Sequence, residues 1–323
     1  MTRVVLTEPP EYEGRDLSVE RSILGADVEL VTFICDDDEE SLISACRDAD
    51  VILTAFSPFT RNIIEQLQQC RLISITATGY GNVDLEAAAD AGIRVCAIDE
   101  YCTDEVADHV ILLMLALCRR LTEYHKQVQE DMSWQFDSLQ GLTRMRDLTL
   151  GIVGFGRIGQ AVARRAQGFG LTIMAFDPFP NEELGADLGV RYCTLEELYA
   201  NADIISLNCS LTADNENLID KDAFEQMKRS PLIINCARGA LIDEEAMVRA
   251  LDTGQISGAG LDVLKDESPD LSSSKLMGHS NVILTPHIAF YSDASMLDNR
   301  MISTANVRNF LDGKDEDVRR YVL

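Results

Sequence analysis

The chain has 323 residues, 46% of them hydrophobic and 25% charged, which is ordinary for a globular protein and long enough for two domains. Its formal net charge of −26 at pH 7 argues against direct binding to nucleic acid or to an anionic membrane surface. The nine cysteines are scattered singly, which favours free thiols in a reducing compartment and argues against a structural zinc, so we expect no metal.

The N-terminal segment leads into a short predicted strand and lacks the apolar core of a signal peptide. The most apolar run, residues 110–118, is too short to cross a bilayer. We therefore predict a cytoplasmic protein that does not bind membranes.

In the first part of the chain, short apolar runs alternate with amphipathic segments. The predicted strands are VVLT, VELVTFI, DVILTA, RLISITAT and IRVCAI, and the predicted helices are EESLISACRDA, TRNIIEQLQQC and VDLEAAADAG. Such a βα series predicts a largely parallel sheet with helices on both faces. One long helix is expected from about Thr103 to Gln129, with TDE as its capping signal.

A second βα series follows an irregular stretch that carries Trp134, the single tryptophan. Its predicted strands are LTLGIVGFG, LTIMAFD, ADIISLNC, PLIINCA, SGAGLDV and NVILT, with helices such as DEEAMVRALDTG between them. A last helix is expected from about Ser292 to Leu311. The sequence thus predicts an α/β fold of two Rossmann-like, doubly wound domains, the second inserted into the first. The expected boundaries are 1–102 plus 292–323 for one domain and 103–291 for the other.

The strongest local signal is the GxGxxG pattern of Gly154, Gly156 and Gly159, which follows a predicted strand and opens a predicted helix. In a βαβ unit these glycines allow a tight turn, the approach of a pyrophosphate, and close packing of helix on strand. Asp177 ends the next strand, where its carboxylate can accept hydrogen bonds from both ribose hydroxyls and would repel a 2′-phosphate. This pattern predicts NAD, rather than NADP, as the cofactor.

Polar residues follow three later strands of the same series, at the edge where a nicotinamide would lie. Arg238 follows IINCA, Asp262 and Glu267 follow GAGL, and His287 follows VILTP. Of the four histidines, only His287 follows a strand on this side. His109 is expected to be a packed or interface residue on the long helix. His287 is therefore our candidate for the proton donor to a carbonyl oxygen.

At these residues the sequence resembles the D-isomer-specific 2-hydroxyacid dehydrogenases, through GFGRIG, NCARG, LDVLKDE and TPHIA in that order. The resemblance implies catalytic roles for Arg238, Glu267 and His287, in an enzyme that interconverts a 2-oxo acid and a D-2-hydroxy acid. It also implies a flavodoxin-like, discontinuous substrate domain, an inserted NAD-binding domain, and a homodimer formed through the long helix.

The resemblance assigns further residues to ligands. Implied for the substrate are backbone amides of Ala77, Thr78 and Gly79 in TATGYGNVD, together with Arg238 and His287. Implied for the cofactor are Thr78, Gly154, Gly156, Arg157, Ile158, Gly159, Asp177, Cys209, Ser210, Asn215, Cys236, Ala237, Arg238, Asp262, His287 and Ala289, with Asp262 at the nicotinamide amide.

Within the family, EYCTDEVADH and HIAFYSDAS look closest to the branch of the C-terminal-binding-protein corepressors. An alternative function is therefore an NAD(H)-sensing interaction protein. A phosphoglycerate dehydrogenase is a further alternative, although no basic cluster lies near TATGYGNVD to receive a phosphate. Departures from the family pattern at Ile75, Gly81, Ser268 and Phe290 affect the substrate pocket, so they bear on substrate identity rather than on the reaction.

Overall fold

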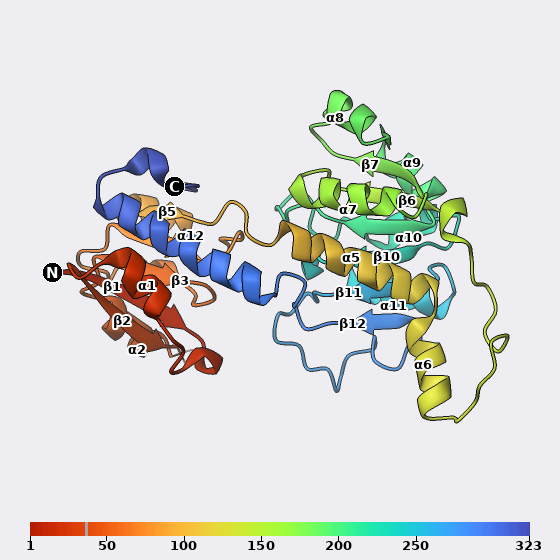
Figure 1. The fold of residues 1–323 in the computed structure, drawn as a ribbon, viewed down its shortest axis with the longest axis horizontal. Coiled ribbons are helices and arrows are strands. Elements are labelled where there is room, and N and C mark those ends of the chain that lie inside the picture. Colours follow the sequence, from red (N-terminus) through yellow and green to blue (C-terminus); the bar gives the residue numbers. More distant parts are fainter. Residues whose placement is uncertain (36–37) are drawn as a thin grey trace. The chain divides into compact units, whose positions relative to one another are not determined.

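The computed structural model describes residues 1–35 and 38–323. The chain forms two compact units, drawn in Figure 1. One contains Met1–Tyr101 and Ser292–Leu323, and the other contains Cys102–Tyr291. The division thus falls one residue before the expected boundary at 102, and the C-terminal segment belongs to the same unit as the N-terminus.

The first unit is built on a five-stranded parallel sheet with the order β2-β1-β3-β4-β5. This is the flavodoxin-like strand order. The strands are β1 (Thr2–Glu8), β2 (Val28–Ile34), β3 (Val51–Thr54), β4 (Leu72–Ile75) and β5 (Arg94–Cys96). The helices are α1 (Ser18–Leu24), α2 (Glu39–Cys46), α3 (Arg61–Ile64), α4 (Leu85–Asp90) and α12 (Asp293–Leu311).

Burial explains why the central strands read as continuous apolar runs. Every residue of β3 and β4 is buried, as expected for strands covered by helices on both faces. Helix α12 lies along α1 and brings the C-terminal segment back to this sheet (Figure 1). Its start is fixed by a capping box, in which Ser292 and Ser295 bond reciprocally to each other's backbone.

The second unit carries a seven-stranded parallel sheet with the order β12-β11-β10-β9-β6-β7-β8. Counted within the unit, six of these strands have the dinucleotide-binding order 3-2-1-4-5-6, which β12 extends by one. The strands are β6 (Thr149–Val153), β7 (Thr172–Phe176), β8 (Val190–Tyr192), β9 (Ile204–Leu207), β10 (Leu232–Asn235), β11 (Gly258–Leu261) and β12 (Val282–Leu284). The helices are α5 (Thr103–Cys118), α6 (Leu121–Gln129), α7 (Arg157–Gln167), α8 (Glu182–Asp187), α9 (Leu195–Asn201), α10 (Lys221–Gln226) and α11 (Glu244–Asp252).

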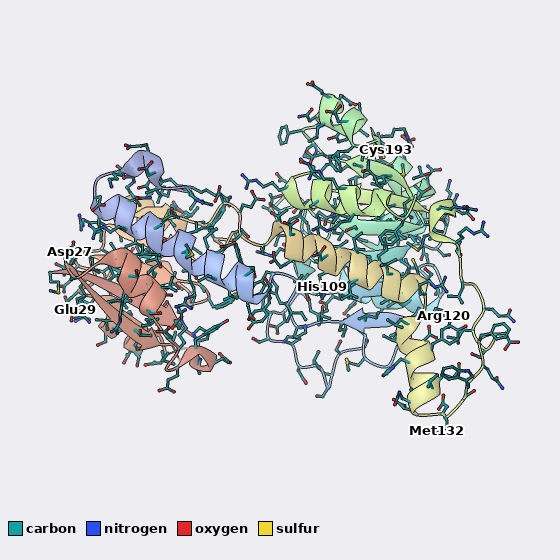
Figure 2. All side chains as sticks on the ribbon, viewed as in Figure 1. Asp27, Glu29, His109, Arg120, Met132 and Cys193 are labelled. Atoms are coloured by element: carbon teal, nitrogen blue, oxygen red, sulfur yellow. The ribbon has the colours of Figure 1, made fainter. Side chains whose placement is uncertain are left out.

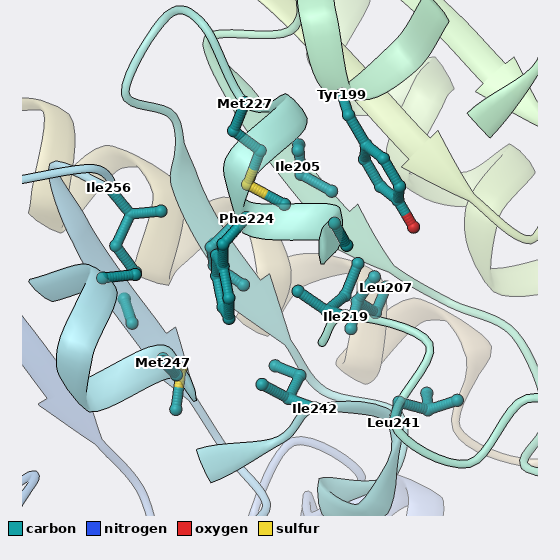
Figure 3. Packing of buried hydrophobic residues seen from close by; sticks show 14 of the residues in the cluster. Tyr199, Ile205, Leu207, Ile219, Phe224, Met227, Leu241, Ile242, Met247 and Ile256 are labelled. Carbon is teal, nitrogen blue, oxygen red and sulfur yellow. The ribbon is translucent and has the colours of Figure 1, made fainter. Parts of the chain in front are cut away.

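Both faces of this sheet are packed with apolar side chains. Figure 3 shows one of these clusters, in which Phe224, Met227 and Met247 fill the space between the helices and the sheet. The other face packs against α5 and α7, whose buried residues include Val110 and Val162. The sheet is therefore a rigid support for the loops at its edges. No described helix is long and apolar enough to span a membrane.

The two predicted βα series, and with them the fold class, are confirmed, but the predicted long helix is wrong in one respect. It is divided into α5 and α6 at Arg120, whose φ of +48° is left-handed (Figure 2). The Arg120 guanidinium bonds both oxygens of Glu123, at 2.6 and 2.5 Å. The start of the helix also differs from the predicted TDE cap: the N-cap residue is Cys102, and its side chain makes no capping hydrogen bond.

Candidate active site

The glycine turn between β6 and α7 has the geometry of a dinucleotide site. Gly154 has a φ of +89°, and a Cβ there would lie 2.6 Å from the backbone nitrogen of Cys209. A Cβ on Gly159 would lie 2.3 Å from the carbonyl oxygen of Gly154. At Gly156, by contrast, an added Cβ meets no described atom within 4 Å. Two glycines are thus required by the packing, and the middle one leaves open space where a pyrophosphate can approach.

The turn lies where the strand order reverses. β7 pairs with one side of β6 and β9 with the other, so the residues after β6 and β9 border the crevice in which open α/β sheets bind ligands. Helix α7 begins at this crevice. Its N-cap residue is Gly156, which has no side chain to bond the first amides of the helix. Its first amides therefore present partial positive charge toward a phosphate, and the turn fits a dinucleotide.

Asp177 stands one residue past β7, next to the glycine turn. Its Oδ2 accepts a hydrogen bond of 2.7 Å from the amide of Phe155, and its Oδ1 accepts one of 2.9 Å from the amide of Phe179. Each carboxylate oxygen can accept more than one bond, so lone pairs remain for a ribose. The aspartate therefore also holds the glycine turn in place, a role that its position in the sequence did not reveal.

The loop after β9 is closed by one of the predicted residues. Asn215 donates a hydrogen bond of 2.8 Å to the carbonyl of Ser210 and accepts one of 2.7 Å from the amide of Thr212. Cys209 packs beside Gly154, and burial raises the pKa of its thiol to about 11. Cys209 is therefore a neutral packing residue at pH 7, and the loop is a preformed wall of the crevice.

The carboxyl end of β10 positions Arg238. Asn235 accepts a bond from the amide of Ala237 and donates one to the carbonyl of Arg238, both at 2.9 Å. Gly239 comes next, where a Cβ would lie 1.9 Å from the backbone of Leu264, so only glycine fits. Within the described residues, the Arg238 guanidinium bonds only the carbonyl of Ala237, at 2.7 Å. Its remaining donors are available for a carboxylate.

His287 and Glu267 form the main side-chain pair at this edge. The imidazole Nδ1 lies 2.8 Å from Oε2 of Glu267. The ring also packs edge-on against Phe290, with ring centroids 5.8 Å apart. The hydrogen bond from His287 lowers the pKa of Glu267 most strongly, the charges of His287 and Arg238 lower it further, and burial opposes them. The bond to Glu267 orients the ring, and it leaves Nε2 of His287 without a hydrogen bond to any described residue.

Asp262 holds the backbone on the far side of His287. It is 1% exposed, and its carboxylate accepts bonds from the Thr285 hydroxyl at 2.5 Å and from the amides of Ile288 and Ala289 at 2.9 and 2.8 Å. Among the described residues, the hydrogen-bond donors to this carboxylate are thus all residues of the loop around His287. The nicotinamide contact expected of Asp262 stays a prediction, as does a contact of the nearby Cys236.

The predicted substrate loop, TATGYGNVD, belongs to the first unit. Its carbonyls are bonded: Thr76 accepts from Asn299 at 2.6 Å, Ala77 from the amide of Ile98 at 3.0 Å, and Thr78 from Arg320 at 3.1 Å. In the described part of the chain, the amides of residues 77–79 donate to no group. A loop whose carbonyls are fixed and whose amides are free is suited to receive an anion.

Two site residues were missed from the sequence. His109 on α5 bonds Thr285 at 2.9 Å, so it is more than a packed residue (Figure 2). Thr285 links it to Asp262. The residues lie 176 positions apart, and no local pattern signals such a contact. Among the described residues, no group of three or more His, Cys, Asp or Glu side chains is arranged to hold a metal ion.

A Rossmann-type sheet with a glycine turn, an aspartate after the second strand and a histidine–carboxylate pair at the same edge is typical of NAD-dependent dehydrogenases. Comparison with known families agrees: residues 111–289 match the NAD-binding domain of the D-isomer specific 2-hydroxyacid dehydrogenases. The chain therefore belongs to the D-isomer-specific 2-hydroxyacid dehydrogenase family, and it is an NAD-dependent enzyme that interconverts 2-oxo acids and D-2-hydroxy acids.

Individual relatives are similar over nearly the whole chain. A hydroxypyruvate reductase from Blautia hydrogenotrophica is 34% identical over 286 residues, which are 87% of this chain and 88% of the relative. A D-lactate dehydrogenase from Escherichia coli is 31% identical over 318 residues, or 94% and 95% of the two chains. The crystal structure of D-lactate dehydrogenase from Aquifex aeolicus, complexed with NAD and lactic acid, is 29% identical, with a TM-score of 0.88 over 99% of this chain and 98% of that one.

Proposed function

We propose that this enzyme reduces a small 2-oxo acid through Arg238, Glu267 and His287, with the proton supplied by His287. The observation that carries the proposal is the 2.8 Å contact between Nδ1 of His287 and Glu267, at the sheet edge that also bears the glycine turn. Because Glu267 accepts a hydrogen bond from Nδ1 of His287, Nε2 is the ring atom left to exchange a proton with the substrate oxygen.

Each residue has a separate task in this mechanism. Arg238 binds the carboxylate of the 2-oxo acid and polarises the neighbouring carbonyl, for which a planar guanidinium is well suited. When NADH is bound along the glycine turn, its nicotinamide would supply the hydride that the carbonyl carbon accepts. His287 gives its Nε2 proton to the carbonyl oxygen, and Glu267 stabilises the protonated ring beforehand. In the reverse direction the neutral imidazole takes the hydroxyl proton.

We further propose that the free amides of residues 77–79 receive the substrate carboxylate, which makes the first unit the substrate domain and the second the NAD-binding domain. The relatives point to small substrates, because they are named for hydroxypyruvate and D-lactate. Pyruvate and hydroxypyruvate are therefore the first 2-oxo acids to test.

The experiment is a panel of 2-oxo acids with NADH, followed by absorbance, on the unmodified protein and on His287→Ala. General acid–base catalysis is commonly worth about 10²–10⁴-fold, so turnover by the variant should fall at least ~10²-fold in both directions. NADH affinity should stay nearly unchanged, because the glycine turn and Asp177 are untouched. His279→Ala, just before β12 and away from the proposed site and interface, is the matched control and should keep full activity. Full activity of His287→Ala on every accepted substrate would refute the mechanism.

We also propose a homodimer through α5 and the chain that follows it, in a cytoplasmic enzyme. The support is that two large apolar side chains of this region are exposed: Leu112 on α5, within the apolar run 110–118, is 55% exposed, and Leu121 at the start of α6 is 57% exposed. Light scattering at micromolar concentration tests this. Placement in the corepressor-like branch rests on the segments EYCTDEVADH, RMRDLTLGIVGFGRIGQAVARRAQGFG and HIAFYSDAS. Catalysis without any protein partner would favour a metabolic enzyme instead.

A further inference from the structure

A chain of hydrogen bonds runs from α5 to the backbone that presents His287. It begins at Nε2 of His109, 2.9 Å from the hydroxyl oxygen of Thr285. That hydroxyl lies 2.5 Å from Oδ1 of Asp262. The carboxylate of Asp262 in turn accepts hydrogen bonds from the amides of Ile288 and Ala289, the two residues after His287. The helix is thereby connected to the loop of the proton donor through two side chains.

The direction of each bond in this chain follows from its chemistry. A carboxylate has no proton to give, so the Thr285 hydroxyl donates its single proton to Asp262. The Thr285 oxygen can then only accept from His109, which means that Nε2 of His109 carries a proton. The network is therefore polarised in one direction, from the imidazole through the hydroxyl to the carboxylate.

The same residues hold His287 in an unusual backbone conformation. Its φ is +52°, a left-handed value that costs a non-glycine residue free energy unless the surroundings hold it. The amide of His287 lies 2.8 Å from the carbonyl of Asp262 and 3.0 Å from that of Thr285. Asp262 and Thr285 thus fix the loop before, at and after the histidine.

The network is shielded from solvent, and hydrogen bonds are stronger where water is excluded. Asp262 is 1% exposed, and the side chain of His109 is 11% exposed. A buried carboxylate that loses a donor is left with uncompensated charge, so the loop would rearrange to supply another. The imidazole of His109 is the only member of the chain that comes from a helix, and it anchors the loop to the packed face of the sheet.

We propose that His109 is a positioning residue for the dehydrogenase reaction: through Thr285 and Asp262 it fixes the backbone that aims His287 at the substrate. This inference rests on the proposed function, because it takes His287 as the proton donor. His109 itself need not touch the substrate for this role. Its effect should therefore appear in kcat and in the dynamics of the loop, while cofactor affinity is spared.

The kinetic test compares His109→Leu, Thr285→Val and the double variant. Loss of one hydrogen bond should lower kcat about 3- to 10-fold, with NADH affinity changed by less than about twofold. Because both side chains act through one chain, the double variant should be little worse than the poorer single variant. Thr285→Ser keeps the hydroxyl and should return kcat to near the unmodified value. Multiplicative losses in the double variant, or full kcat in His109→Leu, would overturn the proposal.

A second readout does not depend on turnover. Hydrogen exchange of the amides of Ile288 and Ala289 should become faster in His109→Leu and in Thr285→Val, while exchange in the core strand β9 should stay unchanged. If the unmodified protein reduces no 2-oxo acid, the proposed function fails, yet this exchange still reports whether the network holds the loop. Unchanged exchange at both amides would refute the positioning role even if kcat falls. Should His109→Leu fail to fold, Thr285→Val breaks the same chain without altering α5.

Discussion

Each unit contains a glutamate paired with a basic side chain, and the two pairs differ in burial. The comparison shows how burial distinguishes a structural role from a chemical one. In the first unit, Glu20 on α1 is 2% exposed and binds Arg300 on α12 through two bonds of 2.7 Å. In the second unit, Glu267 binds His287 at 2.8 Å, but their side chains are 56% and 37% exposed. The distances are nearly equal, so the difference in role comes from the surroundings.

The surroundings set what each carboxylate can do. Burial by itself raises the pKa of Glu20, but the hydrogen bond from Arg300 and the charge of Arg15 outweigh it, and the pKa is lowered overall. Both cations of that cluster stay protonated, so the pair joins α1 to α12 at every pH at which Glu20 is ionised. The Glu267 pair contains an imidazole, a side chain that can act as a general acid or base, and both members are partly exposed.

The largest expected effect comes from breaking the buried pair with Arg300→Met. Removing one partner of a buried pair commonly costs about 3–5 kcal/mol, and the remaining Arg15, at 3.0 Å from Glu20, should keep the loss near the lower value. Because the folded pKa of Glu20 is lowered, its stabilising effect is present above its unfolded pKa and disappears in acid. The loss should therefore shrink below about pH 4.

Urea unfolding at pH 7 and at low pH measures this change. Arg191→Met is the matched control: its pair with Glu197 is 2.6 Å long but exposed, so it should cost less than about 1 kcal/mol. Equal losses for the two variants would mean that burial does not distinguish the pairs. NADH affinity of Arg300→Met should be unchanged, since the glycine turn belongs to the other unit.

A third carboxylate, Asp177, is expected to have another role: it selects the cofactor. It should favour NADH over NADPH by more than about tenfold, because each charged hydrogen bond is worth roughly 1.5–3 kcal/mol and a 2′-phosphate would be repelled. Asp177→Ser should lose most of that preference, measured by fluorescence titration with the two cofactors. Equal affinities in the unmodified protein would contradict the assignment of Asp177 to the ribose.

Glu267→Gln tests the exposed pair directly. The amide keeps the shape but not the charge, so the protonated imidazole of His287 loses its partner. Reduction needs that protonated form. The bond to His287 lowers the pKa of Glu267, and such coupling is reciprocal, so the pH dependence of the reduction rate should shift to lower pH in the variant. The free energy of unfolding should barely change, in contrast to Arg300→Met. A pH dependence that does not shift would show that Glu267 is not coupled to the proton donor.

Glu8→Gln should have the smallest effect, although Glu8 lies in the same buried cluster as Glu20. Burial raises the pKa of Glu8 more strongly than Arg15 lowers it, and Oε2 of Glu8 has no hydrogen-bond partner in the described residues. A neutral amide should therefore be tolerated within about 1 kcal/mol. Because the folded pKa of Glu8 is raised, its stabilising contribution is lost as pH rises through that pKa, so the variant should gain stability relative to the native protein as pH rises above about 4. Thermal unfolding at several pH values measures this trend. A variant whose melting temperature falls relative to the native protein as pH rises would contradict it.

The sequence by itself determined the features that rest on local pattern. Alternating apolar runs predicted both βα series, because strand and helix periodicity depend on near neighbours. Gly154, Gly156 and Gly159 were recognisable because each must fit a fixed turn within one βαβ unit. The short strand β8 was missed, since its three residues are too few to show a period.

Only the tertiary structure decided the contacts between distant segments. The helix breaks at Arg120, although the helical pattern of the sequence continues on both sides of it. The left-handed backbone of Arg120 and the contact of its guanidinium with Glu123 cannot be read from periodicity. His109 and Thr285 meet across 176 residues, and Glu20 and Arg300 across 280. Such pairs depend on how helices pack against a finished sheet. A hydrogen bond requires atoms to lie within about 3 Å, and that precision is set by packing rather than by the residue pattern of either segment.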